Sequence, residues 1–257
     1  MINIDSYAYS NTLKTVHPAE KFLFAMITLV VCLTSSTLIT PLIVLALMTG
    51  GIIIKAGIPG RVFVKLMLVP LSFLLLSVLT IAFSVSTTSQ TGFWIAHNVG
   101  GLTIGIRLSD LATAVHIFVK SLGAVSCLYF LALTTPMTEI ITVLGKMRVP
   151  VIITELMVLI YRFIFVFMEI VTTIRRAQSS RLGYVSMKSS FRSLSQLFSA
   201  LFGKVFLKSN ELFDTMASRG YTGEIKVLAK KYPISLKNYL VLTLLEIPLV
   251  LLNLLGR

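Results

Sequence analysis

The chain alternates long apolar stretches with short polar connections, and this pattern predicts a helical membrane protein. The apolar stretches cover about residues 22–39, 41–54, 66–86, 108–133 and 238–256. Stretches of roughly 18–20 apolar residues match the thickness of the hydrocarbon core of a bilayer. The sequence therefore predicts an all-α, multi-pass integral membrane protein with about five transmembrane helices.

Two further helices are predicted between the fourth and fifth stretches. Residues 151–171 are strongly apolar, and charged residues recur there every seven positions, at Glu155, Arg162, Glu169 and Arg176. This spacing places the four residues, called the charged stripe below, along one slowly drifting line of a helix. From about 189 to 219, apolar residues follow the i, i+3, i+4, i+7 pattern of an amphipathic helix, whose start Ser189 or Ser190 is expected to cap.

The charge distribution orients the chain in the membrane. Only 13% of the residues are charged, against about 25% in a soluble domain. The loop at 55–65 carries three basic residues and no acidic one, whereas the loop at 86–106 carries no charge. Because basic loops stay on the cytoplasmic side, we expect a cell-membrane protein with a cytoplasmic N-terminus.

The basic segment 171–237, with 12 basic and 3 acidic residues, affects the interpretation of residues 151–171. A crossing at 151–171 would place this basic segment outside, and a charge at the centre of a membrane helix costs about 2.5–3.5 kcal/mol. We therefore expect the helices at about 151–182 and 189–219 to lie at the cytoplasmic interface. The expected domains are residues 1–135 with four transmembrane helices, a cytoplasmic coupling module at 136–237, and a last transmembrane helix at 238–257.

Both long helices end in a similar short motif. The sequence "RRAQSSRLGY" occupies residues 175–184, and "MASRGY" occupies residues 216–221. A glycine just past a helix end and an arginine in its last turn are favourable in any helix, so two ordinary C-caps would explain both motifs. Small residues around an arginine also allow a partner's backbone to approach, and arginine pairs with carboxylates in a forked geometry. The candidate contact residues are Ala177, Ser180, Arg181, Gly183, Ala217, Ser218, Arg219 and Gly220.

The remaining chemistry points away from an enzyme. No nucleophile–base pair or carboxylate dyad stands in a recognisable context, and no phosphate loop of the GxxxxGK[ST] type is present. The three histidines, His17, His97 and His116, are scattered, so no metal site is expected. Cys32 and Cys127 are interpreted as small buried apolar residues. The basic segment lacks a known nucleic-acid-binding pattern, so no nucleic-acid partner is expected.

The sequence resembles a known transport family over nearly its whole length. The resemblance lies in "IDSYAYSNTLKTVHPAEKFLF", in "TTPMTEIITVLGKMRVPVIITELMVLIYRFI", and in the two arginine motifs. These stretches are similar to the transmembrane T component of energy-coupling factor (ECF) transporters, and specifically to the cobalt permease type called CbiQ. The chain departs from the family pattern at serines before both arginines and at Leu182, where glycine is expected.

The resemblance implies a set of partners and a function. In the family, two long coupling helices end in arginine motifs that dock into two cytoplasmic ABC-type ATPase subunits, and Arg181 and Arg219 match those arginines. The implied function is to couple ATP hydrolysis by these partners to a membrane substrate-binding subunit, without a cofactor bound to this chain. The resemblance leaves room for a small accessory membrane subunit. The charged stripe is expected to contact the substrate-binding subunit or the crossing coupling helix.

Other functions remain open from the sequence. Within the same transporter class, the cargo could be nickel or a vitamin such as biotin in place of cobalt. From other classes, a standalone secondary carrier or a membrane-embedded enzyme is the alternative.

Overall fold

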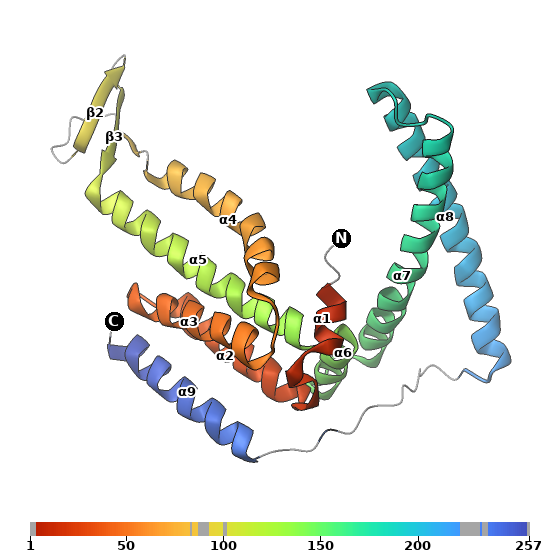
Figure 1. Ribbon diagram of the computed structural model, residues 1–257, viewed down its shortest axis with the longest axis horizontal. Coiled ribbons are helices and arrows are strands. Elements are labelled where there is room, and N and C mark those ends of the chain that lie inside the picture. The colour runs from red at the N-terminus through yellow and green to blue at the C-terminus, as the bar shows by residue number, and fades with distance from the viewer. Residues whose placement is uncertain are drawn as a thin grey trace. The chain divides into compact units, whose positions relative to one another are not determined.

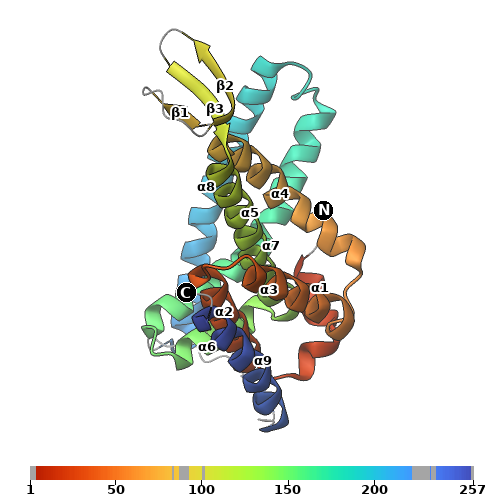
Figure 2. The ribbon, with the colours of Figure 1, turned by 90° about the vertical axis from the view of Figure 1, so that its left-hand side faces the viewer.

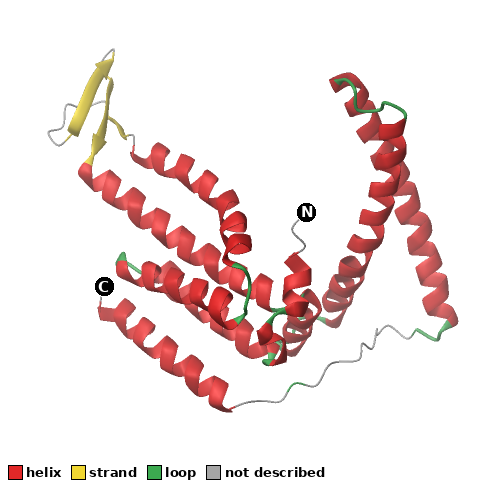
Figure 3. Ribbon diagram, in the orientation of Figure 1, coloured by secondary structure: helices red, strands yellow, loops and turns green. Residues whose placement is uncertain are grey.

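The structure, a computed structural model, describes residues 4–82, 84–86, 93–99, 102–221, 232 and 236–255. In chain order its elements are α1 (Ile4–Ser10), the 3₁₀ helix η1 (Thr12–Thr15), α2 (Pro18–Thr34), α3 (Ile39–Gly50), the π-helical turn η2 (Gly51–Lys55), α4 (Gly60–Ala82), β1 (Ser84–Ser86), β2 (Phe93–Val99), β3 (Leu102–Arg107), α5 (Leu108–Thr134), α6 (Met137–Lys146), α7 (Val151–Ser180), α8 (Met187–Ser218) and α9 (Leu236–Leu255). Helices dominate (Figures 1 and 3), so the predicted all-α class is confirmed.

The chain divides into two compact units, which are described separately. The first unit comprises residues 1–140 and 231–257, and the second comprises residues 141–230. The five apolar stretches predicted from the sequence form α2, α3, α4, α5 and α9 of the first unit. The two long helices predicted near 151–182 and 189–219 form α7 and α8 of the second unit, both without a break.

Two local predictions differ from the structure. Ser186, and not Ser189 or Ser190, caps the start of α8, because the backbone N–H of Ser189 donates to Ser186 Oγ at 3.2 Å. The uncharged region expected to be a loop at 86–106 contains strands of a small antiparallel sheet with the order β1-β3-β2. The sequence analysis considered only its lack of charge, although β-branched and aromatic residues in it favour strands.

Polar side chains join α9 to α2 within the first unit. Thr28 Oγ1 donates to Glu246 Oε1 at 2.6 Å, and Asn253 Nδ2 donates to Thr34 Oγ1 at 2.8 Å. Both pairs advance in the same order along the two helices, so α2 and α9 run parallel, side by side (Figure 2). Hydrogen bonds of this kind hold helices together where water is excluded, and the sequence analysis did not anticipate Glu246, which is buried.

The N-terminal segment fastens several helix ends at one end of the bundle. Asn11 Nδ2 donates to the carbonyl oxygens of Leu133 and Thr134, and the N–H of Thr12 donates to the Ala56 carbonyl at 3.2 Å. The buried ammonium group of Lys21, in the first turn of α2, donates to the Thr134 carbonyl at 2.8 Å. The start of α2 and the ends of η2 and α5 therefore lie together. Because α9 runs parallel to α2, α9 begins at this same end of the bundle, where α5 stops.

Length and composition mark three of the described helices as able to cross a membrane. They are Gly60–Ile81 of α4, Asp110–Thr134 of α5, and Val151–Ser180, which is α7; Ile39–Lys55 and Leu242–Leu255 are shorter apolar helices. These criteria do not separate α7 from α4 and α5. The interfacial position of α7 therefore stays a prediction.

Among the glycines of the bundle for which the structure describes the surroundings, Gly123 of α5 has the least room for a side chain. A Cβ atom at this position would lie 2.8 Å from Cys32 Sγ and 3.1 Å from the Pro41 carbonyl oxygen. The contact with the sulfur is shorter than real Cβ atoms make, and the contact with the oxygen is unusually tight, so glycine at 123 allows α2, α3 and α5 to approach this closely.

We expect Gly123→Ala to destabilise the protein by about 1–3 kcal/mol, the usual cost of overpacking a core. The melting temperature in detergent, followed by circular dichroism, should fall by several degrees. Gly203→Ala is the matched control, since a Cβ at Gly203 meets no atom within 4 Å. A fall for the control as large as that for Gly123→Ala would contradict this account of the packing.

Candidate functional site

The two arginine motifs adopt the same backbone geometry at the ends of α7 and α8. Arg181 and Arg219 are the C-cap residues of these helices. After Arg181, the N–H groups of Leu182 and Gly183 donate to the carbonyls of Ser179 and Gln178, at 3.1 and 2.8 Å. After Arg219, the N–H groups of Gly220 and Tyr221 donate to the carbonyls of Ala217 and Met216, both at 3.0 Å. Both ends are therefore Schellman motifs, with Arg181 and Arg219 in equivalent positions.

The residue after each arginine has a positive φ, but the two residues differ. Gly220 has φ 73°, as expected for a glycine that ends a helix. At the end of α7 the same position is filled by Leu182, with φ 58°. The expectation that Gly183 is the left-handed terminator of α7 is therefore wrong. A non-glycine residue in this conformation costs roughly 1–2 kcal/mol.

Gly183 serves a different purpose, which is close packing against α8. A Cβ on Gly183 would lie 2.7 Å from Ser193 Oγ and 2.8 Å from the Gln178 carbonyl oxygen. The Gly183 carbonyl accepts hydrogen bonds from the hydroxyls of Ser189 and Ser193, each at 2.8 Å. The turn that joins α7 to α8 is thus fixed through the backbone of Gly183.

Side chains missed by the sequence analysis complete this turn. Gln178 Nε2 donates to the Ser193 carbonyl at 2.8 Å, and Tyr184 Oη donates to Gln178 Oε1 at 2.7 Å. The guanidinium group of Arg175 lies 5.9 Å from the centre of the Tyr184 ring, within the range of a cation–π contact. Much of "RRAQSSRLGY" therefore builds the turn. The one sequence signal that could have revealed this role is a lone glutamine among small residues.

The predicted contact residues are accessible at both helix ends. Ala177, Ser180 and Arg181, together with Ala217, Ser218, Arg219 and Gly220, are exposed, while Gly183 is half-buried. We call residues 177–183 the first tip and residues 217–220 the second tip. Because α8 has 32 residues and joins the two tips, they are ~48 Å apart along its axis. The structure does not bring the two tips together.

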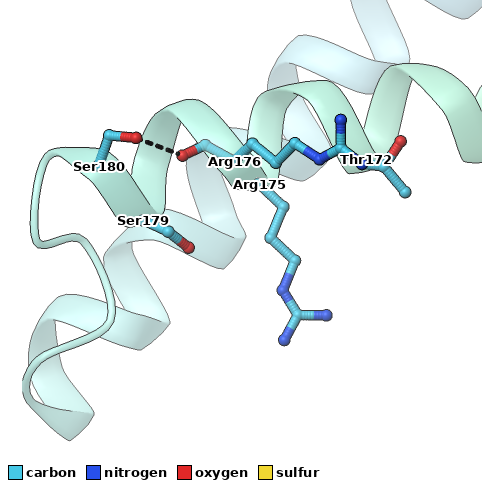
Figure 4. Close-up of a pocket in the computed structure, with 5 residues that line it drawn as sticks. All are labelled: Thr172, Arg175, Arg176, Ser179 and Ser180. Atoms are coloured by element: carbon cyan, nitrogen blue, oxygen red, sulfur yellow. Dashed lines mark hydrogen bonds between the residues drawn. The ribbon is translucent and has the colours of Figure 1, made fainter.

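A shallow depression lies beside the first tip (Figure 4). It has a volume of about 560 Å³ and is lined by Thr172, Arg175, Arg176, Ser179 and Ser180. Arg176 extends along the helix toward Thr172, whereas Arg175 projects away from them. The Ser180 hydroxyl donates to the Arg176 carbonyl at 3.0 Å. Guanidinium groups beside hydroxyls suit a carboxylate of a protein partner.

The charged stripe runs along α7, and its first member reaches the end of α8. Tyr221 Oη donates to Glu155 Oε2 at 3.2 Å, and partial desolvation together with this carboxylate raises the pKa of the Tyr221 phenol. Arg162, Glu169 and Arg176 are exposed on α7. Successive members of the stripe are about 10 Å apart along α7, too far to form ion pairs with one another.

The histidines do not assemble into a metal site in the described part of the chain. No group of three or more histidine, cysteine, aspartate or glutamate residues that could hold a metal occurs there. His17 instead caps α2, where its Nδ1 accepts from the Ala19 N–H at 3.1 Å. Its ring meets Tyr232 edge-on, with the ring centres 6.0 Å apart.

The apolar helices of the bundle, together with the long helices α7 and α8, are those of an all-α membrane protein. Residues 9–228 match the family described as cobalt transport protein, CbiQ. The chain belongs to this family.

The relatives are consistent with this assignment. The chain is 34% identical to the uncharacterized protein MJ1089 of Methanocaldococcus jannaschii, over 97% of this chain and 91% of that protein. It is 34% identical to the cobalt transport protein CbiQ of Salmonella typhimurium, over 62% of this chain and 70% of that one. It is also 32% identical to a putative fused cobalt transport protein CbiMQ of Methanocorpusculum labreanum, over 86% of this chain and 36% of that protein.

We expect Leu182→Gly to stabilise the end of α7 by up to about 1 kcal/mol, because glycine adopts a positive φ without strain. Leu182 is 72% exposed, so little packing is lost. Hydrogen exchange of the Gly183 amide should slow by roughly fivefold. The reciprocal variant Gly220→Leu should speed exchange of the Tyr221 amide. Unchanged exchange at both amides would contradict the assigned backbone geometry.

Proposed function

We propose that this chain is the transmembrane coupling subunit of an ATP-driven cobalt importer of the ECF type. The observation that carries the proposal is the pair of exposed arginines, Arg181 and Arg219, in equivalent Schellman motifs at the ends of two long helices. An ordinary C-cap needs no arginine at the cap residue itself. The same cation in the same geometry at both ends suits a partner with two similar acidic grooves.

The partners that fit are two cytoplasmic ABC-type ATPase subunits, each holding one tip. ATP binding and hydrolysis in these subunits would change the distance between their grooves. Since each tip is fixed to its helix by a hydrogen-bonded cap, such a displacement would be passed to α7 and α8 rather than absorbed by a loose chain end. The helices would then move a separate membrane subunit that binds the cargo. This chain would carry no catalytic residue and bind no nucleotide.

Cobalt is favoured as the cargo by the relatives. The family description and the names of the Salmonella and Methanocorpusculum proteins refer to cobalt transport. The chain matches only 36% of the fused Methanocorpusculum protein. Most of that polypeptide therefore lies outside the match, which supports a neighbouring cobalt transport component as a partner of this chain.

The parallel pairing of α2 and α9 supports a cytoplasmic position for the second unit. Because α5 stops and α9 begins at one end of the bundle, the chain between them crosses the membrane either twice or not at all. Crossing twice would bury α8, whose charged residues include Lys188, Arg192, Lys204 and Lys208. The cost of placing these charges in the membrane favours no crossing. The shared end also carries basic residues, so it is the cytoplasmic one.

Charge reversal at the tips tests the coupling role. We expect Arg181→Glu or Arg219→Glu to reduce cobalt uptake by at least roughly tenfold, the loss that corresponds to removing a charged hydrogen-bonded contact of about 1.5–3 kcal/mol. Recovery of the ATPase subunits with the tagged chain, or ATP hydrolysis per cobalt ion transported, should change in parallel.

Lys204→Glu is the matched control, because Lys204 is an exposed basic residue near the middle of α8, away from both tips. It should leave uptake and ATPase recovery near wild type. Normal uptake and normal ATPase binding in both tip variants would overturn the assigned role of these arginines.

The topology is tested by a pair of cysteines in a background where the buried Cys32 and Cys127 are replaced by alanine. Ser186→Cys, in the turn between α7 and α8, should react with an impermeant maleimide only from the cytoplasmic side. Ser36→Cys, in the exposed turn between α2 and α3, should react only from the outside. Labelling of both positions from the same side would contradict the proposed topology.

A further inference from the structure

A cavity of about 480 Å³ lies within the first unit, at the end of the bundle where the N-terminal segment is fastened. Its walls come from η1, α2, α3, η2, α5 and α9. The apolar lining consists of Leu13, Val16, Phe24, Leu47, Ile54, Phe130, Leu242 and Leu245. None of its lining residues belongs to either tip, and none of the functions derived above uses it.

Two glycines and a π-helical turn create this space. Gly50 and Gly51 line the cavity where α3 passes into η2. A Cβ on Gly50 would meet no atom within 4 Å, so the absence of a side chain leaves real volume. A Cβ on Gly51 would lie 3.2 Å from the Phe130 ring, which packs edge-on against Phe24 with ring centres 5.5 Å apart. Single π-helical turns within helices are frequent at functional sites.

The polar side chains of the lining are Glu20, Lys21 and Lys55. Glu20 and Lys21 carry opposite charges and are both buried in the first turn of α2. Lys21 is already engaged, since its ammonium group donates to the carbonyls of Leu13 and Thr134. Lys55 ends η2, is exposed, and forms no ion pair in the part of the chain that the structure describes. The cavity thus combines a long apolar interior with two buried, oppositely charged residues at the start of α2 and a solvent-accessible cation, Lys55, at its edge.

The surroundings of the cavity indicate what can enter it. Ile54, which lines it, is 81% exposed, and the neighbouring Ile53 and Leu245 are also exposed. These side chains belong to the apolar helices α3–η2 and α9, whose outer surfaces face lipid in a membrane protein. A water-soluble ligand has no route through such a surface, whereas a lipid chain is already in contact with it.

We propose that this cavity binds one hydrocarbon chain of an anionic phospholipid, with the lipid phosphate paired to Lys55. The apolar walls match the chain, and the lysine at the end of the bundle matches a phosphate at the depth of the headgroups. The bound lipid would fill the space beside the π-helical turn and join η2 to α9. This proposal does not depend on the cobalt-import function.

The test titrates phosphatidylglycerol or phosphatidylcholine into the delipidated, detergent-solubilised protein and counts bound lipids by native mass spectrometry. We expect one tightly held phosphatidylglycerol per chain, with weaker binding of phosphatidylcholine. Lys55→Gln should remove a preference of about fivefold for phosphatidylglycerol over phosphatidylcholine. This factor corresponds to about 1 kcal/mol per basic residue at an anionic surface. Lys65→Gln is the control, because Lys65 is an exposed lysine of α4 that does not line the cavity.

Filling the cavity gives a second, independent readout. Gly50→Leu should abolish tight binding of either lipid, and Gly50→Ala should weaken it, whereas Gly203→Leu on α8 should leave it unchanged. Equal lipid binding by wild type and Gly50→Leu would overturn the proposal. A photo-crosslinker placed at Ile54 gives a further check in membranes. Capture of a polypeptide by this crosslinker would also overturn the proposal, because the cavity would then hold a partner helix instead of a lipid.

Discussion

The parallel contact between α2 and α9 is the constraint on which the rest of the architecture depends. Two hydrogen-bonded pairs, Thr28 with Glu246 and Thr34 with Asn253, set the direction in which the last helix runs. The pair with Glu246 is the costlier one to lose, because its buried carboxyl group would be left without this hydrogen-bond partner inside an apolar bundle. Reversing α9 would separate both pairs. The direction of α9 in turn requires the chain between α5 and α9 to begin and end at the same end of the bundle.

The sequence was informative where a long periodic pattern was present. The apolar stretches of the bundle and the lengths of α7 and α8 follow from hydrophobic periodicity, which persists over many residues and tolerates local exceptions. The interhelical polar pairs were not predictable, because Glu246 lies 218 positions from Thr28 and only the folded chain brings them together. The strands between α4 and α5 are short, and their pairing likewise depends on contacts that a local pattern does not encode.

The candidate site was predicted in part. The positions of Arg181 and Arg219 at helix ends were readable, because glycine and small residues mark where helices stop. The backbone conformation was predicted for Gly220 but not for Leu182, since a leucine with a positive φ contradicts its own preference. The turn between α7 and α8 accounts for this exception. Gly183 is needed one residue later, where Ser193 leaves no room for a side chain, so the left-handed position falls on the leucine.

The two tips share their backbone geometry but are connected differently to the remainder of the chain. The first tip continues directly into α8 through a turn fixed by Gln178, Gly183 and Ser193, so both of its neighbours in the chain are long helices. The second tip follows α8 and precedes the segment that returns to α9. If two identical partner subunits each held one tip, the same movement of each subunit would therefore act on two differently connected helix ends. The resulting movement of α7 and α8 would be asymmetric.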